Sequence, residues 1–594
     1  MAASISQSRS LFLWVDAMWM PTPENRDGKN QGSSFLLAVW TELFDPFTPD
    51  SFQPRIHNVA SLCDELCDVS FRLDDSSIWW QHIRQIRDEL AHAVDEEQSL
   101  LTPEHNWLLQ KLLSASNVRD VQIYSRLTAE RSQSYQSILL DKIRLGTAEL
   151  PRKKERAYAS LRQLATIAVQ SSKEDDDVLT GLPGFLASPE VIMDVLITKS
   201  MEAGVLFDCV FAVAGKHGVV RQVVERVGLR ICKPDPLPKD KVDQIQCAIN
   251  EVFFVTVSVE ARSRRDAVNK SRKQLGVGVD ILNLYSNSEA LRVLDDVFIK
   301  RANDDEFSTF SQSEQAFRRL QPRNRAAEDT AETIKSISQN RLEDRVLSAL
   351  ELHSMAMSSS EPRVKLINFW SALECLAGCH EAESIYHRVV NLVCPLLAWR
   401  RVDKVVRYTA IQTKKYADTI DSYSFGPGFR KRTNHYVHPW DMMLALCRPK
   451  DHDHICELLR FAGGHPLLVF RLYRLWKELH NPKSLKATLE SSYRRIEWQL
   501  RRIYRARNLL VHHGVEVPML GSLLDNLQYY ASITIQRIIH GMKFGPNWGV
   551  RESMAYWSAK HNYVMSRLAE RPSDLRVSDF FPVEGHDVAP PLWT

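Results

Sequence analysis

The sequence predicts a mainly α-helical protein of several domains, with a small α+β element in its middle. A chain of 594 residues exceeds what one hydrophobic core usually organises, so more than one domain is expected. Apolar residues recur at helical spacing over most of the chain, which is typical of amphipathic helices. The segment VFFVTVSVEA at 252–261 is instead rich in β-branched and aromatic residues, as strands are.

The order of the parts follows changes in periodicity along the chain. Helical spacing dominates up to the acidic run from Glu174 to Asp177, and the GLPG turn after it breaks the pattern. The strand at 252–261 and the basic helix expected after it form an α+β element. The expected parts are a mostly helical N-terminal domain (1–178), an α+β middle domain (179–305), a linker (306–340), a helical bundle (341–545) and a C-terminal extension (546–594).

The bulk composition excludes several classes of protein. With 44% hydrophobic and 25% charged residues, the chain is typical of a soluble globular protein, not of a disordered or fibrous one. A net charge of +3 excludes binding of nucleic acid through overall charge, so such a site must be a local cluster. The sequence contains neither the G-x-x-x-x-G-K-[ST] motif nor the G-x-G-x-x-G motif of nucleotide-binding proteins. No cofactor is expected.

The N-terminal segment and the cysteines indicate a cytoplasmic protein that does not enter a membrane. No stretch reaches the roughly 18 consecutive apolar residues of a membrane helix. Asp16 interrupts the short apolar run near the start, and no clear cleavage site for a signal peptide follows it. The ten cysteines show no extracellular framework, so reduced and mostly buried thiols are expected.

The segment 493–514, YRRIEWQLRRIYRARNLLVHHG, predicts a long amphipathic helix that ends at Gly514. This segment contains one acidic residue, Glu497, and six arginines. Like charges on one helix repel one another unless a polyanion neutralises them. We therefore expect Arg501, Arg502 and Arg505 to contact RNA. The arginines of this helix are Arg494, Arg495, Arg501, Arg502, Arg505 and Arg507.

The end of this helix carries residues suited to RNA cleavage. Asn508 and His512 are four residues apart and share a face, whereas Arg507 lies about 140° from His512 on an ideal helix. A deformed last turn would bring Arg507 closer. RNA supplies its own nucleophile, the 2′-OH, so His512 could move protons while Arg507 stabilises the charged phosphorane and Asn508 orients the ring or a phosphate oxygen. This scheme requires no metal.

Three segments resemble the HEPN superfamily. RIYRARNLLVHHG (502–514) is similar to its signature, in which an arginine precedes a histidine by five to seven positions and a polar residue follows the arginine. KLINFWSALECLAG (365–378) resembles the first helix of Apea-like HEPN domains and carries Glu374. LLDNLQYYASITIQRII (523–539) resembles the closing helix of that family, so the resemblance covers roughly 341–545.

This resemblance implies a helical bundle with metal-independent endoribonuclease activity. It implies Arg507 and His512 as the catalytic pair, Asn508 as the intervening polar residue and Glu374 as a supporting acid. It also implies a homodimer in which two motifs face each other and make one composite site. Domains of this kind resemble effectors of bacterial antiphage and toxin systems that act by abortive infection and cut host or phage RNA, tRNA among the candidates.

Several other patterns allow two interpretations each. Arg87, Asp88 and His92 repeat the spacing of the motif, and they predict either a second active site or a surface helix with an exposed ion pair. Six residues could supply a structural zinc site, although solvent-exposed loop histidines are the simpler interpretation. They are His435, His438, Cys447, His452, His454 and Cys456.

Two basic stretches lie outside the motif helix. Arg430, Lys431 and Arg432 sit in a Gly/Pro-rich loop with aromatic neighbours, which suits single-stranded RNA or a charged loop facing solvent. The stretch that begins at Arg262 and ends at Lys273 could bind a nucleic acid or another acidic partner, although a solvated helix face is the simpler interpretation.

Two rival classes remain beside the nuclease: a non-catalytic HEPN-like bundle used as an interaction surface, and a regulator that binds RNA without cutting it. The N-terminal half carries no recognised catalytic motif. By elimination it is expected to regulate the C-terminal part and to sense a trigger derived from phage.

Overall fold

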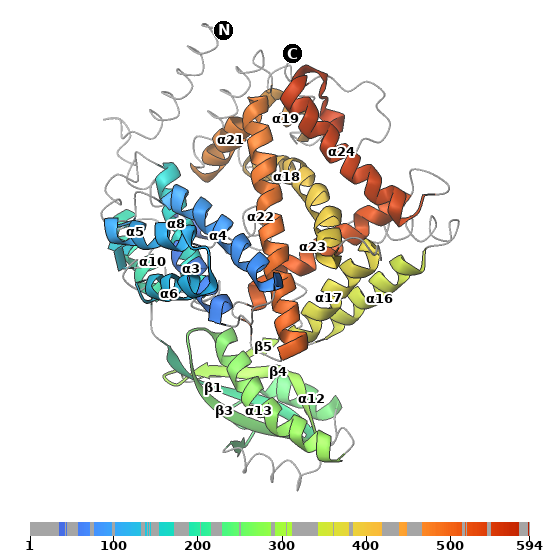
Figure 1. Ribbon diagram of the computed structural model, residues 1–594. Coiled ribbons are helices and arrows are strands. Elements are labelled where there is room, and N and C mark those ends of the chain that lie inside the picture. The colour runs from blue at the N-terminus through green and yellow to red at the C-terminus, as the bar shows by residue number, and fades with distance from the viewer. Residues whose placement is uncertain are drawn as a thin grey trace.

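A computed structural model (Figure 1) gives the fold of the chain and confirms the mainly α-helical class with a small sheet. Among the helices that it describes, none combines the length and apolar character needed to cross a membrane. The structure describes residues 35–41, 43, 58–71, 77–97, 101–131, 137–138, 140–141, 143, 154–170, 189–201, 204–215, 229–248, 251–286, 291–304, 306–311, 343–359, 361–378, 384–417, 439–447, 466–513, 517, 520–542, 548–580 and 592.

The N-terminal helices form one core of their own, around Leu62, Ile83 and Leu109, which are all fully buried. Helix α5 begins where Pro103 sets the first turn and the Thr102 hydroxyl accepts a hydrogen bond from the His105 amide. The helices are α3 (Val59–Phe71), α4 (Ser77–Glu97), α5 (Pro103–Ser114), α6 (Val118–Glu130), α8 (Lys154–Gln170) and α10 (Pro189–Met201).

Helix α10 corrects the expected boundary between the first two domains. It was expected in the middle domain, which the sequence placed at 179–305. Instead α10 packs on α8, and Met193 and Leu196 belong to the core of the N-terminal helices. The pattern of apolar residues identifies a helix but does not say which core buries it.

The middle domain is an antiparallel sheet with a helix on each face. The sheet order is β2-β3-β1-β4-β5, so the first strand along the chain lies in the centre. Alternate residues of a strand face opposite sides: Phe211 points into the core under α13, and Val210 points into the core under α12. The elements are β1 (Val205–Gly215), β2 (Arg230–Cys232), α12 (Lys239–Ala248), β3 (Val252–Ala261), α13 (Arg264–Ser286), β4 (Leu291–Arg301) and β5 (Ser308–Ser311).

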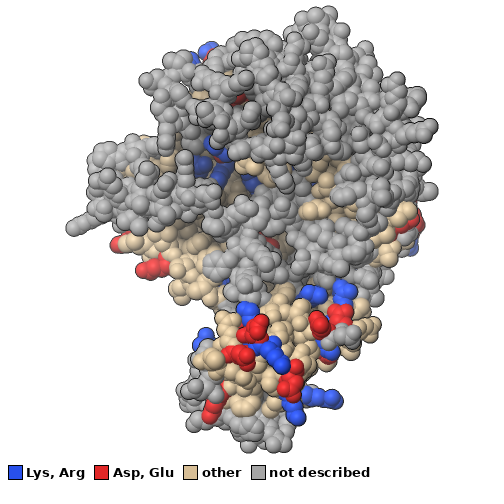
Figure 2. Space-filling view, turned by 180° about the vertical axis from the view of Figure 1, so that it is seen from behind, with Lys and Arg blue, Asp and Glu red and all other residues tan. Residues whose placement is uncertain are grey.

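Basic residues of α13 are engaged locally. Lys270 forms an ion pair with Asp266 at 3.0 Å, and Arg272 donates a hydrogen bond to the Leu294 carbonyl at 3.3 Å. On the face of this domain seen in Figure 2, acidic and basic side chains are interleaved. These contacts favour a solvated helix face over a continuous basic patch.

The C-terminal bundle surrounds one long helix, α22, which packs against α18, α21, α23 and α24. Helix α24 was expected in a C-terminal extension, but Trp557 and Val564 lie in the same core as the rest of the bundle. The helices are α16 (Asp344–Ser358), α17 (Pro362–Ala377), α18 (Ile385–Ala417), α19 (Pro439–Cys447), α21 (Pro466–Leu479), α22 (Pro482–Asn508), α23 (Leu520–Met542) and α24 (Val550–Glu570).

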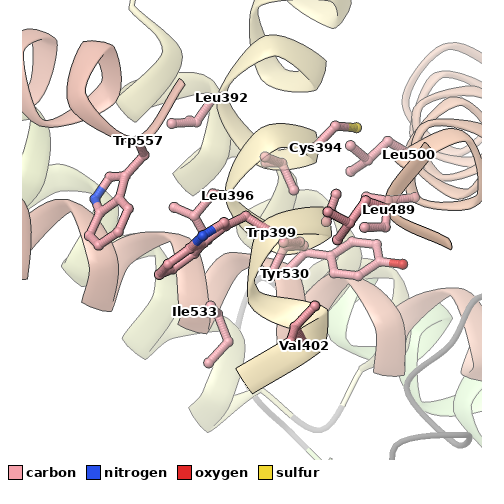
Figure 3. Close-up of a cluster of buried hydrophobic side chains, with 14 of the residues drawn as sticks. Leu392, Cys394, Leu396, Trp399, Val402, Leu489, Leu500, Tyr530, Ile533 and Trp557 are labelled. Atoms are coloured by element: carbon pink, nitrogen blue, oxygen red, sulfur yellow. The ribbon is translucent and has the colours of Figure 1, made fainter. Parts of the chain in front are cut away.

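Large aromatic residues fill the centre of this bundle (Figure 3). The Trp399 ring packs beside that of Trp557, with centroids 5.5 Å apart, and Tyr530 is also buried. Trp399 Nε1 donates a hydrogen bond to the Asp579 carbonyl at 2.7 Å, which ties the segment after α24 to α18. A buried indole N–H needs such a partner.

We expect Leu489→Ala to lower the free energy of unfolding of the bundle by about 2–5 kcal/mol, because Leu489 is fully buried and its truncation leaves a cavity. Urea denaturation followed by tryptophan fluorescence measures this loss. Leu347→Ala is the matched control, since Leu347 is 44% exposed and its change should stay within about 0.5 kcal/mol. Equal effects of the two substitutions would contradict the assignment of this core.

Candidate functional site

The end of α22 does not continue as a regular α-helix. The helix begins at the Asn481 cap, whose side chain accepts a hydrogen bond from the Lys483 amide at 2.9 Å, and α-helical geometry ends at Asn508. Leu509–His513 then forms a single π-helical turn. The wider i→i+5 turn rotates residues five apart toward a common face, whereas an ideal α-helix separates them by about 140°. His512 is exposed on this turn.

Arg507 reaches toward α17 from the last turn of α22. Its Nη2 lies 3.9 Å from Glu374 Oε2, and its Nη1 donates a hydrogen bond to Asn508 Oδ1 at 3.1 Å. Its Nε is buried and makes no hydrogen bond to any residue that the structure describes. A guanidinium has five N–H donors, so Arg507 keeps donors for an anionic ligand.

Glu374 is held in place by Trp370 on the same helix. The Trp370 indole is fully buried and donates from Nε1 to Glu374 Oε1 at 2.7 Å. The other carboxylate oxygen is thereby left toward Arg507. The Trp370 ring also packs 5.5 Å from that of Tyr504 on α22, which fixes the two helices against each other. Glu374, Arg507 and Asn508, which the sequence analysis assigned to one site, lie together. The sequence analysis did not include Trp370 in this site, although its position four residues before Glu374 places both side chains on one face of the helix.

Arg502 and Arg505 correct the expected RNA-binding face. Arg502 is buried, and its guanidinium donates to Glu65 at 2.8 Å and to Glu89 at 2.8 Å. Arg505 is buried and pairs with Glu65. Both arginines therefore bind the N-terminal helices and are not accessible to RNA. Burial alone lowers the pKa of Arg502, but the charges of Glu65 and Glu89 outweigh this effect and raise it.

The remaining predicted RNA contacts divide into two groups. Arg501 pairs with Glu497 of its own helix, α22, and donates a hydrogen bond to the Tyr386 hydroxyl of α18. Arg430, Lys431 and Arg432 lie outside the described residues. The same holds for the proposed zinc ligands His435, His438, His452, His454 and Cys456, whereas Cys447 is buried in α19. Within the part of the chain that the structure describes, no group of His, Cys, Asp or Glu could hold a metal ion.

Arg87, Asp88 and His92, which repeat the spacing of the motif, lie on α4, and their contacts differ from those of Arg507 and His512. Arg87 Nη1 donates to the Ala115 carbonyl at 2.7 Å, and it forms no ion pair with the residues that the structure describes. The His92 ring lies 5.8 Å from the Trp498 ring on α22. His512 follows Trp498 by fourteen residues, or about 21 Å along a helix, so the two motifs of one chain do not meet in one site.

Helices α4 and α22 are antiparallel neighbours (Figure 1), and His82 of α4 lies at the end of this contact nearer the motif. The His82 ring is 6.5 Å from that of Tyr504. Burial, together with the positive charges of Arg505 and Arg501, lowers the pKa of His82 to about 4. His82 is therefore neutral at physiological pH.

Comparisons with known proteins find no family model that matches the chain, and no curated protein or solved structure that is similar to it. The HEPN resemblance therefore rests on the three sequence segments 365–378, 502–514 and 523–539.

We expect the contact between α4 and α22 to weaken in acid. Free histidine titrates near 6.5 and folded His82 near 4, so the neutral ring contributes stability above pH 6.5 that is lost as the pH falls toward 4. The full loss would be about 3 kcal/mol. Thermal unfolding measured from pH 7 to pH 4 should therefore decline less steeply in His82→Gln than in the wild type. Parallel curves would contradict a buried neutral His82.

Proposed function

We propose that the protein is a metal-independent endoribonuclease whose active site lies at the π turn that ends α22. The observation that carries the proposal is the combination of an exposed His512 with a half-buried Arg507 one turn away, whose only described carboxylate contact is at 3.9 Å. Single π turns inside helices occur frequently at functional sites. The resemblance of this segment to the HEPN signature supports the same assignment.

The proposed reaction is transphosphorylation by the 2′-OH of RNA. The 2′-oxygen attacks the phosphorus and loses its proton to a neutral imidazole, and the bond to the 5′-oxygen breaks as that oxygen gains a proton. The products are a 2′,3′-cyclic phosphate and a 5′-hydroxyl. The positive charge of Arg507 stabilises the negatively charged phosphorane. Asn508 and Glu374 position the Arg507 guanidinium, and His512 transfers protons.

One imidazole per motif cannot be both base and acid in the same step, so we propose a homodimer in which two motifs share one RNA. RNA, with tRNA among the candidates, is the proposed substrate. We further propose a role in bacterial antiphage defence by abortive infection, with a phage-derived trigger acting on the N-terminal helices.

His512→Ala should lower the rate of RNA cleavage by about 10²–10⁴-fold, because it removes the proton-transfer group. RNA binding should be largely kept. The assay incubates the full chain with RNA in EDTA and analyses the ends of the products. The matched control is His92→Gln, the histidine of the second motif with the same spacing from an arginine, and it should cleave as the wild type does.

Loss of cleavage in EDTA, or equal cleavage by His512→Ala and the wild type, would exclude the proposed mechanism. Binding of RNA without any cleavage by the wild type would instead favour the RNA-binding regulator.

The ion cluster between α22 and the N-terminal helices is a candidate restraint on this site. Glu65 and Glu89 hold Arg502 and Arg505 less than two turns before Arg507. We propose that this contact keeps the π turn in a less active geometry until a trigger displaces the N-terminal helices, since an unrestrained ribonuclease would poison its own cell.

The double variant Glu65→Gln/Glu89→Gln tests this restraint in the full chain. Removal of both carboxylates leaves two buried guanidiniums without their partners, which costs several kcal/mol and should release the contact. We expect the basal cleavage rate to rise at least about tenfold, a change of about 1.4 kcal/mol in the barrier. Glu130→Gln, which removes an exposed partner of Arg126, is the control and should leave the rate unchanged. An unchanged or lower rate in the double variant would contradict the restraint.

A further inference from the structure

Three arginines from three helices gather at the C-terminal end of α17. Arg345 lies in the first turn of α16, Arg388 in the first turn of α18 and Arg507 in the last turn of α22. Helix α17 ends at Gly378, whose φ of +72° is in the left-handed region that favours glycine. We refer to Arg345, Arg388 and Arg507 as the arginine cluster.

Two arginines of the cluster lie against the residue that ends α17. Arg388 Nη1 donates a hydrogen bond to the Gly378 carbonyl. A Cβ at this glycine would lie 2.5 Å from Arg345 Nη1, which places the second guanidinium directly against the backbone of Gly378. Arg345 is exposed and Arg388 is half-buried. Two guanidiniums from different helices therefore meet at one helix end.

The packing of α17 on α22 brings this helix end close to the π turn. Trp370 of α17 packs on Tyr504 of α22, with ring centroids 5.5 Å apart. One turn later in both helices, Glu374 lies 3.9 Å from Arg507, so the two helices run in the same direction here. The next turn brings α17 to its end and α22 to the π turn. The arginine cluster and the π turn therefore lie at the same end of the bundle.

The positive charge of the arginine cluster is only partly offset by its surroundings. Neither Arg345 nor Arg388 forms an ion pair with any residue that the structure describes. Arg507 has Glu374 at 3.9 Å. The carbonyl end of a helix carries about half a negative charge, so α17 and Glu374 together offset about half of the three positive charges. Capping of α17 explains one hydrogen bond of Arg388 and leaves this excess of charge for a ligand.

We propose that Arg345 and Arg388 bind the RNA phosphate next to the scissile phosphate, which Arg507 binds. This inference rests on the proposed function, because RNA is the substrate proposed there. A planar guanidinium can donate two parallel hydrogen bonds to the oxygens of one phosphate. Gly378 lies one helical turn, about 5.4 Å, beyond Glu374, which suits the spacing of consecutive phosphates along a single strand.

Binding of an RNA that cannot be cleaved tests this subsite separately from catalysis. The probe is a single-stranded oligonucleotide with 2′-O-methyl groups throughout, which lacks the nucleophile, and it is titrated into the full chain at several salt concentrations. Arg345→Gln and Arg388→Gln should each weaken binding about tenfold, because each removes a charged hydrogen-bond donor. Each should also reduce the slope of log Kd against log salt by about 0.7, the value for one phosphate contact of a single strand. Arg345→Lys keeps the charge and should keep the slope.

Arg363→Gln is the matched control for these variants. Arg363 is in the first turn of α17, fifteen residues before Gly378 and therefore about 22 Å from it along the helix. It should bind the oligonucleotide as the wild type does. Circular dichroism of each variant separates lost binding from lost folding, and Arg345 is exposed, so its substitution should leave the fold intact.

Salt slopes of Arg345→Gln and Arg388→Gln equal to that of the wild type would overturn the subsite, even if the wild type cleaves RNA. Reduced slopes without any cleavage by the wild type would instead leave the subsite standing and refute the nuclease. In the cleavage assay, Arg345→Gln should raise KM for an oligonucleotide about tenfold and leave kcat nearly unchanged, because this phosphate is bound equally in the ground and transition states. A fall in kcat with an unchanged KM would place Arg345 at the scissile phosphate and contradict the proposal.

Discussion

The ion cluster of Arg502 and Arg505 with Glu65 and Glu89 constrains the position of the candidate site. Arg502, Arg505 and Glu89 are buried and Glu65 is partly buried, and burying such charges is costly unless each of them is paired. The cluster also fixes the rotation of α22 about its own axis. Successive residues of a helix are about 100° apart, so Arg505 facing the N-terminal helices puts Arg507 on the opposite side, toward Glu374 of α17.

Sequence patterns identified the motif helix but could not separate its arginines by function. Periodicity and charge predicted a basic helix, and α22 covers most of that segment. The fate of Arg502 depends on Glu65, which lies 437 residues away in the chain, and no local pattern indicates such a partner. The positive charge of an arginine-rich helix can therefore be neutralised in two ways, by a polyanion or by acidic residues of another domain. In the structure, acidic residues of the N-terminal helices neutralise Arg502 and Arg505.

Elements with strong local signals were predicted, and those that depend on distant packing were not. The β-branched run at 252–261 forms β3, whereas its neighbour β1 mixes alanine and aspartate among its apolar residues and was missed. Helix α10 was assigned to the wrong domain, since its apolar residues fit any core. The π turn was anticipated only as a deformed last turn, because Leu509–His513 contains residues that an α-helix also accepts.

Arg502 and Arg507 lie on one helix, yet their hydrogen bonds differ in a way that bears on function. Arg502 donates to two carboxylates at 2.8 Å, so its charge is compensated within the fold. Arg507 has one distant carboxylate at 3.9 Å and a buried Nε without a partner among the described residues. A phosphate oxygen placed between Arg507 and His512 would accept hydrogen bonds from the Nη groups of Arg507, which make few bonds within the fold. The arginine with the weaker carboxylate contact therefore lies one turn before the exposed His512, where the proposed chemistry requires a donor for phosphate.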